Sequence, residues 1–590
     1  MVRYLLVVLS FVIAACCYYC TQPVVAQHQQ VKNLYAQQLT KFASSVDTLL
    51  NTVEHQDTVQ WQRAFKNARL AYKEIEIFAD YYYPATAKAI NGPPVPEIEE
   101  DDPGKIFDPS GFQVMEEMLF PVNDTASRQE LIMQAKILQS LATRLQHSLG
   151  SLVLSDSHVF DALRLQLLRI VSMGLAGADN SISQNSVAEA VISLQSHERY
   201  LAVYGPDKKI KNSIDNAIGQ LQKDTSFVTF NRAGFLVDHI SPLWQLLHTF
   251  QKEKNIPFLN ETALINTASP KLYDSAFFNA LGFSRQGKKA VDTNLVNLGK
   301  QLFFDRRLSG NGLRSCATCH QPQYGYADNI SKNVSVDRRK KLFRNTPTLL
   351  YAALQPVLFA DGRLNFLEDQ AKTVIEDHSE MKGNLSNIAV VLSKDSTYRS
   401  LQKRLGKTTL EGTDITHALA AFLRTTAAFN SPFDRYLQGD KAALSSTAVQ
   451  GFNLFMGKAK CGTCHFMPLF NGTVPPHYQK MEFEVLGTPM GLQRPFVVDS
   501  DEGKFRQTGA AIHRYAFKTP TVRNIALTAP YMHNGVYKSL EEVIDFYDKG
   551  GGAGLGIVLS NQTLSAEPLH LSTEEKTAII EFLKSLSDSK

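Results

Sequence analysis

The chain has 590 residues, which is too long for one hydrophobic core, so we expect two or three domains. A hydrophobic fraction of 44% and a charged fraction of 20% are ordinary for globular proteins. The formal net charge of +4 is small for this length, and no concentrated basic stripe accompanies it. The charge therefore gives no indication that the chain binds nucleic acid.

The first residues have the pattern of an export signal. Arg3 precedes an apolar run over residues 4–15, which is shorter than the roughly 20 apolar residues that a spanning helix needs. The segment Ile13-Ala-Ala-Cys16 resembles a bacterial lipobox, so we predict a signal peptide over residues 1–20 and a lipid on Cys16. Cleavage near Ala26 without a lipid is the alternative. The expected location is the periplasm or cell envelope, with membrane contact only through this lipid.

Residues 30–251 carry a helical pattern with little strand-like alternation. Apolar residues of one such helix recur at three- and four-residue spacing: Trp61, Phe65, Ala68, Tyr72 and Ile75. An acidic, proline-rich segment over residues 91–109 predicts a surface loop. Periodicity is lost over residues 252–278, which we interpret as a linker.

Four cysteines beyond the leader form two Cys-x-x-Cys pairs, each followed by a histidine. The sequence Cys316-Ala-Thr-Cys319-His320 recurs as Cys461-Gly-Thr-Cys464-His465. In this motif both thiols add to the vinyl groups of one haem, and the histidine ligates its iron. Zinc would need four ligands from these residues, and a thioredoxin-like dithiol has no need for the histidine. Two covalent haem c groups are therefore predicted.

The predicted fold class is mainly α. An N-terminal helical bundle is followed by two tandem cytochrome c-like haem domains, over residues 279–440 and 441–590. Near the end of the chain, Ser572 and Glu575 form a capping-box signature before an apolar stripe, which predicts a C-terminal helix.

Four further motifs follow one another in the C-terminal half: Arg344-Asn-Thr-Pro-Thr348, Asp361-Gly-Arg363, Thr519-Pro-Thr-Val-Arg-Asn524 and Leu527-Thr-Ala-Pro-Tyr-Met-His533. They resemble the bacterial di-haem cytochrome c peroxidase family, which includes the MauG-type enzymes. The resemblance covers about residues 293–586. It implies a peroxidatic haem at His320 and an electron-handling haem at His465.

The resemblance also implies distal residues. It places Gln370 and Glu380 beside the first haem, where Glu380 would move the peroxide proton from one oxygen to the other. His378 is a second candidate for this base, although a surface histidine is the plainer interpretation. The distal ligand of the second haem falls at Tyr547, where classical members have methionine and MauG-type members have tyrosine. The alternative is that Tyr547 is a buried helix aromatic.

A calcium ion between the haem domains is implied as well. Its ligands would be the side chain of Asn345 and the backbone carbonyls of Thr528 and Pro530. Such an all-oxygen set suits a hard cation.

The sequence departs from the family pattern in three places. Residues 321–343 contain no histidine to block the first iron, so we predict an open distal position that needs no reductive activation. Ala360 replaces the usual tryptophan before Asp-Gly-Arg. Electron transfer between the haems would then occur by direct tunnelling or through a relay residue. Tyr351 is a conceivable relay, whereas Phe359 is a poor one. Val374 stands where the family often has proline.

The N-terminal half resembles the imelysin-like helical domains, some of which are associated with iron uptake. The matching segments are Ala68-Arg-Leu-Ala-Tyr-Lys-Glu-Ile-Glu76, Ile90-Asn-Gly-Pro93 and Gly111-Phe-Gln-Val-Met-Glu116. Gln113 replaces the histidine of the usual Gly-x-His-x-x-Glu pattern. We therefore expect a scaffold or partner-docking domain and no metal site at Gln113 and Glu116.

The function predicted first is reduction of hydrogen peroxide with electrons from a small redox protein, such as a c-type cytochrome or a cupredoxin. A MauG-like, peroxide-dependent oxidation of a partner protein is the second possibility. The third is a di-haem electron-transfer lipoprotein without peroxidase chemistry.

Overall fold

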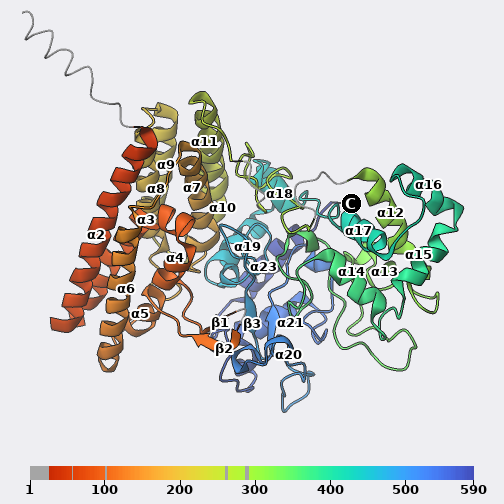
Figure 1. Ribbon diagram of the computed structural model, residues 1–590. Helices are drawn as coiled ribbons and strands as arrows, with labels where there is room; N and C mark the ends of the chain where they lie inside the picture. The colour runs from red at the N-terminus through yellow and green to blue at the C-terminus, as the bar shows by residue number, and fades with distance from the viewer. Residues whose placement is uncertain (1–25, 56–57, 100–101, 260–263, 286–291, 590) are drawn as a thin grey trace, which may run out of the picture.

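The computed structural model describes residues 26–55, 58–99, 102–259, 264–285 and 292–589. Its helical bundle and its haem half lie side by side (Figure 1). Cys16 and the predicted leader lie outside the described residues. In the part of the chain that is described, no helix is long and apolar enough to cross a membrane.

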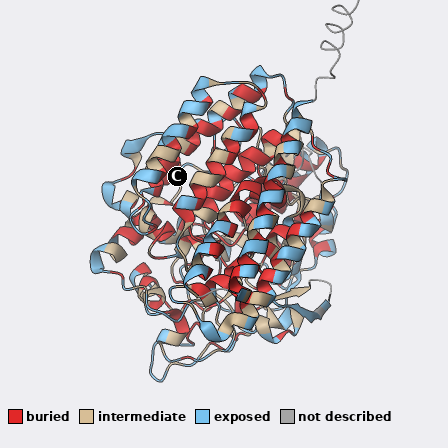
Figure 2. Cartoon of the chain, turned by 90° about the vertical axis from the view of Figure 1, so that its left-hand side faces the viewer, coloured by how far each residue is buried: buried red, intermediate tan, exposed pale blue. Residues whose placement is uncertain are grey.

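The N-terminal half is a bundle of long helices, as the sequence predicted. The apolar stripe is confirmed, because its five residues are all buried. Figure 2 shows buried residues on the inner faces of these helices and exposed residues outside. The helices are α2 (Gln27–His55), α3 (Trp61–Tyr82), α4 (Pro84–Asn91), α5 (Phe112–Leu119), α6 (Arg128–Ser148), α7 (Asp156–Arg169), α8 (Ser186–Ala202), α9 (Lys208–Lys223), α10 (Arg232–Phe235) and α11 (Ser241–Glu253), with π-helical turns η3 (Ile170–Gly174) and η4 (Leu236–Ile240).

The acidic segment after α4 is on the surface, but it is not simply a loop. It contains the antiparallel strands β1 (Glu97–Glu99) and β2 (Asp102–Phe107), paired from Glu97 with Phe107. An ion pair of 2.6 Å between Lys105 and Glu99 joins the strands. Opposite charges across a strand pair favour pairing, and this effect is not visible in the composition of the segment.

The haem half is mostly helical, and its described residues include one small antiparallel pair of strands, β3 and β4. Its first part contains α12 (Thr293–Phe304), α13 (Cys316–Cys319), α14 (Leu367–Glu376), α15 (Leu385–Ser393), α16 (Ser396–Arg404), α17 (Gly412–Leu423) and α18 (Pro432–Leu437). Its second part contains α19 (Ser446–Met456), β3 (Phe483–Val485), α20 (Phe505–Thr508), β4 (Ala516–Lys518), α21 (Leu540–Asp548), α22 (Gly551–Gly554) and α23 (Thr573–Ser585). The predicted capping box is confirmed: the Glu575 backbone N–H donates to the Ser572 hydroxyl, and the Ser572 N–H donates to the Glu575 carboxylate.

The two haem domains repeat one helix crossing. In the first, α12 crosses α17 so closely that a Cβ on Gly299 would lie 1.8 Å from the Ala418 carbonyl oxygen. In the second, α19 crosses α23, and a Cβ on Gly451 would lie 1.9 Å from the Ala578 carbonyl oxygen. In each crossing the first helix precedes a Cys-x-x-Cys-His motif in the chain and the second helix follows it, which supports two tandem domains of one kind.

Two hydrophobic cores are found among the described residues. One lies within the first haem domain and runs from Leu298 to Leu423. The other is continuous from the bundle into the second haem domain. Helix α18, before the predicted boundary at residue 440, belongs to this second core, because Phe433 packs against Phe452 and Phe582.

Polar contacts follow the same junction between bundle and second haem domain. His477 forms an ion pair of 3.4 Å with Asp80 of α3, and the Lys460 amine donates to the Ser181 carbonyl at 3.4 Å. The Ala233 N–H donates to the Asn453 side chain at 2.9 Å. The bundle is therefore docked on the domain that carries the second motif.

Candidate active site

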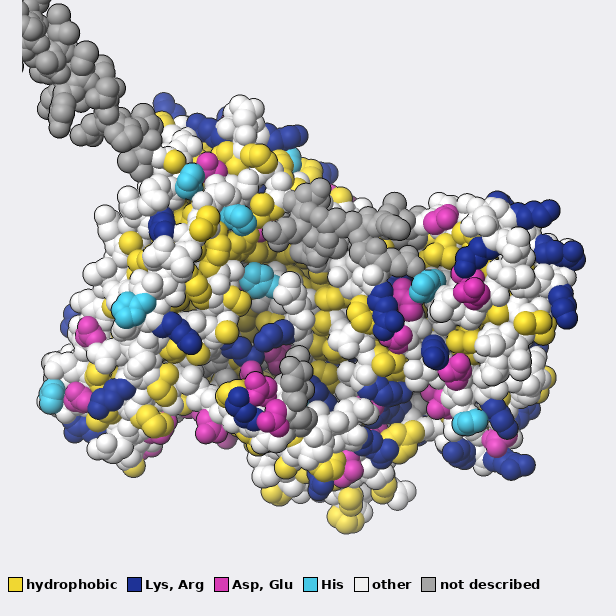
Figure 3. All heavy atoms as spheres, viewed as in Figure 1, with side chains coloured by type: hydrophobic (Ala, Val, Ile, Leu, Met, Phe, Trp, Pro, Cys, Tyr) yellow, Lys and Arg dark blue, Asp and Glu magenta, His cyan; other side chains and the backbone are white. Residues whose placement is uncertain are grey.

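A cavity of about 1910 Å³ lies where the bundle and the two haem domains meet. Figure 3 shows the hollow between the two halves, with hydrophobic side chains inside it. Typical small-molecule pockets have volumes of about 300–1,000 Å³, so this cavity has room for more than one large cofactor. The residues predicted for the haem, distal and calcium sites all line it: Cys316, Cys319, His320, Asn345, Gln370, Glu380, Cys461, Cys464, His465, Thr528, Pro530 and Tyr547.

The first motif forms the short helix α13. Ser315 precedes it and forms a capping box with Thr318, whose hydroxyl accepts the Ser315 N–H at 3.0 Å. His320 uses Nδ1 to bind the Tyr326 carbonyl at 2.9 Å, which leaves Nε2 for a metal. Burial lowers the pKa of His320, so the ring stays neutral, the form that ligates iron.

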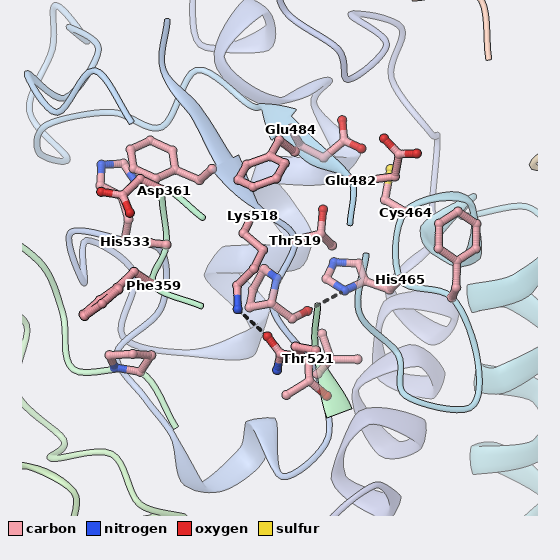
Figure 4. A pocket seen from close by; sticks show the side chains of 18 of the residues that line it. Phe359, Asp361, Cys464, His465, Glu482, Glu484, Lys518, Thr519, Thr521 and His533 are labelled. Atoms are coloured by element: carbon pink, nitrogen blue, oxygen red, sulfur yellow. Dashed lines mark hydrogen bonds between the residues drawn. The ribbon is translucent and has the colours of Figure 1, made fainter. Parts of the chain in front are cut away.

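The second motif has the same arrangement. Nδ1 of His465 lies 3.2 Å from the Phe470 carbonyl and 3.1 Å from the Pro520 carbonyl, the contact drawn in Figure 4. Burial lowers the pKa of His465 to about 4. Burial also raises the pKa of Cys461 to about 12, and that of Cys316 to the same value, so these free thiols are protonated. Two thiols and an available Nε2 in each motif fit two covalent haems.

Tyr547 lies on α21, close to the second motif. Its pKa is raised well above the ordinary value, first by burial and then by the charges that Cys464 and Cys461 would carry. The phenol thus lies within electrostatic range of the second pair of thiols and lines the same cavity.

Glu380 and Gln370 lie on the side of the first motif. Gln370 belongs to α14, and the Glu380 N–H donates to the Asp377 carboxylate at 2.9 Å just beyond that helix. The Glu380 pKa is raised to about 7, chiefly by burial and then by Asp377, against the opposing charges of Arg363 and Arg314. His378 is exposed, which agrees with its interpretation as a surface residue.

The Arg-Asn-Thr-Pro-Thr and Asp-Gly-Arg motifs form an ionic clamp between the haem domains. Arg344 donates to Asp361 at 2.7 Å and to Asp501 of the second domain at 2.6 and 3.1 Å. Arg363 binds the same Asp361. A planar guanidinium that binds two carboxylates holds the two haem motifs at a defined separation.

The later motifs also hold the chain across this junction. Arg523 forms a buried two-point ion pair with Asp434, at 2.7 and 3.0 Å. The Asn345 N–H donates to the His533 carbonyl at 2.7 Å, and the Asn345 side-chain nitrogen donates to the Ile330 carbonyl. Asn345 therefore lies where the first domain meets the segment of Thr528 and Pro530.

The cavity contains a lysine that sequence reasoning missed. Lys518, at the end of β4, donates to the Gln355 side chain and to the Val357 carbonyl, and its backbone N–H donates to the carbonyl of Ala360. Burial lowers its pKa to about 8. Figure 4 shows the side chain between Phe359 and His465, so an amine lies beside the position where the family has tryptophan. No local pattern marks this lysine.

The bundle side of the site contains paired charges. Arg69 pairs with Glu189, and Lys73 pairs with Asp179, both at 2.7 Å. Gln113 donates to a backbone carbonyl, and Glu116 accepts a backbone N–H from Ser183 at 3.0 Å. No group of three or more His, Cys, Asp or Glu able to hold a metal occurs in the described ranges. Gln113 and Glu116 thus each make a hydrogen bond to the backbone within the bundle, and the scaffold role stays a prediction.

Comparison with known proteins agrees with this geometry. Residues 293–442 match the family model of the di-haem cytochrome c peroxidases. The chain is 36% identical over 315 residues to the cytochrome-c peroxidase IdrP1 of Pseudomonas sp. (strain SCT), covering 50% of this chain and 81% of the relative. The chain belongs to the di-haem cytochrome c peroxidase family. As a member of this family it is an oxidoreductase with two haem groups.

A MauG relative, a solved MauG-like structure and a second family model also match the chain. The chain is 35% identical over 293 residues to the methylamine utilization protein MauG of Methylorubrum extorquens, covering 49% of this chain and 77% of the relative. A solved MauG-like protein associated with microbial copper homeostasis is 28% identical, with a TM-score of 0.44, over 50% of this chain and 90% of that one. Residues 24–155 match the imelysin model, which confirms the N-terminal resemblance. Both the peroxidase and the MauG-like interpretation fit the family.

Proposed function

We propose that the chain reduces hydrogen peroxide at the haem held by Cys316, Cys319 and His320. The observation that carries the proposal is Glu380, a half-buried carboxyl in the wall of the cavity that also contains His320, with a pKa raised to about 7. A carboxyl with a near-neutral pKa both accepts and returns a proton at physiological pH. Bound haem supplies the redox chemistry that cleaves the O–O bond.

The chain's own residues would handle the proton and orient the substrate. Glu380 would take the proton from one peroxide oxygen and give it to the other, which would then leave as water. The side-chain amide of Gln370 donates a hydrogen bond that orients the peroxide. Arg314 and Arg363, which oppose the pKa shift of Glu380, stabilise its carboxylate form during the transfer.

Electrons would enter through the haem held by Cys461, Cys464 and His465, and Tyr547 would be a further ligand of that haem. Their source would be a small redox protein, a c-type cytochrome or a cupredoxin, in the periplasm or cell envelope. A lipid on Cys16 would hold the enzyme at the membrane.

The test is an absorption and low-temperature EPR spectrum of the as-isolated ferric protein, followed by one equivalent of hydrogen peroxide. We expect one high-spin and one low-spin haem and an immediate reaction without prior reduction. The low-spin signal should disappear in Tyr547→Phe. Two low-spin haems that ignore peroxide until they are partly reduced would overturn the open distal site.

A MauG-like oxidation of a partner protein is the second candidate, and a tyrosine at position 547, within electrostatic range of Cys464, favours it. A phenolate ligand stabilises oxidised iron and lowers the reduction potential, whereas methionine raises it. A second haem with a potential well below that of c-type cytochromes would favour this candidate. A reduction potential high enough for a c-type cytochrome to reduce the second haem would favour peroxide reduction.

We also propose a calcium ion at Asn345, Thr528 and Pro530, all of which line the cavity at the domain junction. Removal of calcium with a chelator should then alter the EPR spectrum and lower the activity, and added calcium should restore both. Full activity and an unchanged spectrum after chelation would exclude the site.

A further inference from the structure

Tyr351 lies directly behind the wall of the haem cavity. Its neighbours Leu349 and Ala352 line the cavity, while the Tyr351 ring packs into the core shared with the second haem domain. The side chain is 1% exposed, so it is shielded from solvent. A redox-active side chain in this place would be close to the haem centre and protected from quenching.

The Tyr351 hydroxyl has a base as its partner. It donates to the carboxylate of Asp588, with distances of 2.9 and 2.8 Å to the two oxygens. Asp588 also accepts hydrogen bonds from the Asn524 side chain at 2.8 Å and from the Asn430 backbone N–H at 3.3 Å. Both of these donors are neutral, so the carboxylate remains available for a proton. Such geometry is within the range required for proton transfer.

Other groups near the ring carry charge, but they compensate one another. Arg523 lies over the Tyr351 ring at 5.1 Å, and one of its nitrogens is 3.5 Å from the phenol oxygen. Its guanidinium is paired with the buried carboxylate of Asp434 at 2.7 Å. The charge that remains beside the phenol is therefore that of Asp588, and a negative charge there favours loss of an electron.

The backbone of Tyr351 is in an unusual conformation. Its φ is +62°, in the left-handed region that a bulky side chain rarely adopts. Such strain is concentrated at functional sites, because elsewhere nothing favours its retention. The strained backbone directs the ring to Asp588 and to Phe429.

A continuous series of aromatic rings leads from Tyr351 into the bundle. The ring centroids of Tyr351 and Phe429 are 4.9 Å apart. Phe429 stacks on Phe278 with a centroid distance of 4.2 Å and an angle of 4° between the ring planes. The next two centroid distances are 5.0 Å from Phe278 to Phe277 and 5.7 Å from Phe277 to Trp244. Trp244 is buried in α11, and its indole N–H donates to the Ser269 carbonyl at 2.8 Å. The series ends at a side chain that can be oxidised.

We propose that Tyr351, with Asp588 as its proton acceptor, is a redox-active residue that carries oxidising equivalents from the haem centre toward Trp244 in the bundle. This inference rests on the proposed reaction with peroxide, which supplies the oxidant. Tyr351 loses one electron to the peroxide-oxidised haem centre, and its phenolic proton moves to Asp588. An electron from Trp244 then reduces the tyrosyl radical, the proton returns to the phenolate, and the indole keeps its own proton as a cation radical.

The test is rapid-freeze EPR of the haem-loaded full chain after one equivalent of hydrogen peroxide. Protein labelled with ring-deuterated tyrosine should give a narrower radical signal than unlabelled protein. The signal should disappear in Tyr351→Phe and persist in Tyr478→Phe. The matched control suits this comparison, because Tyr478 is equally buried but its hydroxyl donates to the Met467 backbone carbonyl, which is not a base.

Two further variants address the proton and the destination. Asp588→Asn keeps the ring and should slow formation of the radical by about 10²-fold. Trp244→Phe should prolong the tyrosyl signal, because the next electron source is lost. A radical signal and a decay of the oxidised haems that are the same in Tyr351→Phe and the unmodified protein would overturn this inference alone. Haems that do not react with peroxide at all would overturn the proposed function and this inference together.

Discussion

Burial moves the pKa values of two titratable side chains of the cavity, Glu380 and Lys518, in opposite directions, since it disfavours whichever form is charged. Glu380 is shifted up to about 7, and Lys518 is shifted down to about 8. Both groups are thereby brought close to physiological pH, where each can change its protonation state during turnover. A carboxyl and an amine of this kind are expected where protons and electrons move together.

Glu380→Gln should lower the rate constant for the reaction with hydrogen peroxide by about 10²–10⁴-fold, because the amide cannot accept the proton. In the unmodified enzyme the rate should rise with pH through about 7, as the carboxyl loses its proton and becomes a base. The variant should lose this pH dependence. Stopped-flow absorption across pH 5–9 measures both effects.

Glu376→Gln is the matched control for that experiment, since Glu376 is exposed at the end of α14. It should react like the unmodified enzyme at every pH. If Glu380→Gln retains the rate and the pH profile, another group moves the proton.

Lys518→Met should raise the free energy of unfolding at pH 7. The pKa of Lys518 is lower in the folded state than in the unfolded state. The protonated form of Lys518 therefore lowers the free energy of unfolding. The penalty is complete below about pH 8 and is relieved as the pH rises toward 10.5, the ordinary lysine value. The advantage of the variant should therefore shrink over this range in urea titrations. An advantage that does not change with pH would indicate improved packing instead of a removed charge.

The same lysine shows how far the sequence could predict the site. The two Cys-x-x-Cys-His motifs stand out because two thiols and a histidine lie within five consecutive residues, so their spacing alone indicates haem attachment. Lys518 contacts Gln355, and Tyr351 contacts Asp588, across long stretches of chain. Such pairs are made by the tertiary fold and leave no local pattern.

At the scale of elements, close helix crossings determine the shape of each haem domain. Gly299 and Gly451 permit the backbones to touch, and any side chain there would separate the helices. The helices themselves were predictable from apolar spacing, and α23 also from its capping box. The hairpin of β1 and β2 was not, because its strands are short and their pairing depends on cross-strand contacts.

Gly451→Ala should lower the free energy of unfolding by about 1–3 kcal/mol, because the new Cβ overlaps the Ala578 carbonyl oxygen and forces α19 and α23 apart. Gly219→Ala is the matched control, since Gly219 lies inside α9 with open space around it. There the change should stabilise the protein by about 0.5–1 kcal/mol, because alanine favours a helix. Equal effects at both positions in denaturant titrations would contradict the close crossing.

At the scale of the whole molecule, the bundle and the second haem domain form one folding unit, because they share one hydrophobic core. The sequence could not indicate this, because apolar periodicity shows which face of a helix is buried but not what covers it. The linker over residues 252–278 separates the two halves in the chain, yet Phe277 and Phe278 bring the bundle into contact with Phe429. The first haem domain has a core of its own and is joined to the rest by the ionic clamp of Arg344 and by the packing of Tyr351 into the other core.

Urea unfolding should therefore show two transitions. The bundle and the second haem domain should unfold together in one, and the first haem domain should unfold in the other. Trp61 and Trp244 are the only tryptophans of the chain, and both lie in the bundle, so tryptophan fluorescence reports the bundle. The fluorescence change should coincide with loss of the low-spin EPR signal expected for the second haem, while the first haem changes separately. Asp80→Asn, which removes the ion pair to His477, should lower the midpoint of the shared transition only. If fluorescence and the second haem change at different urea concentrations, the common core does not couple these domains.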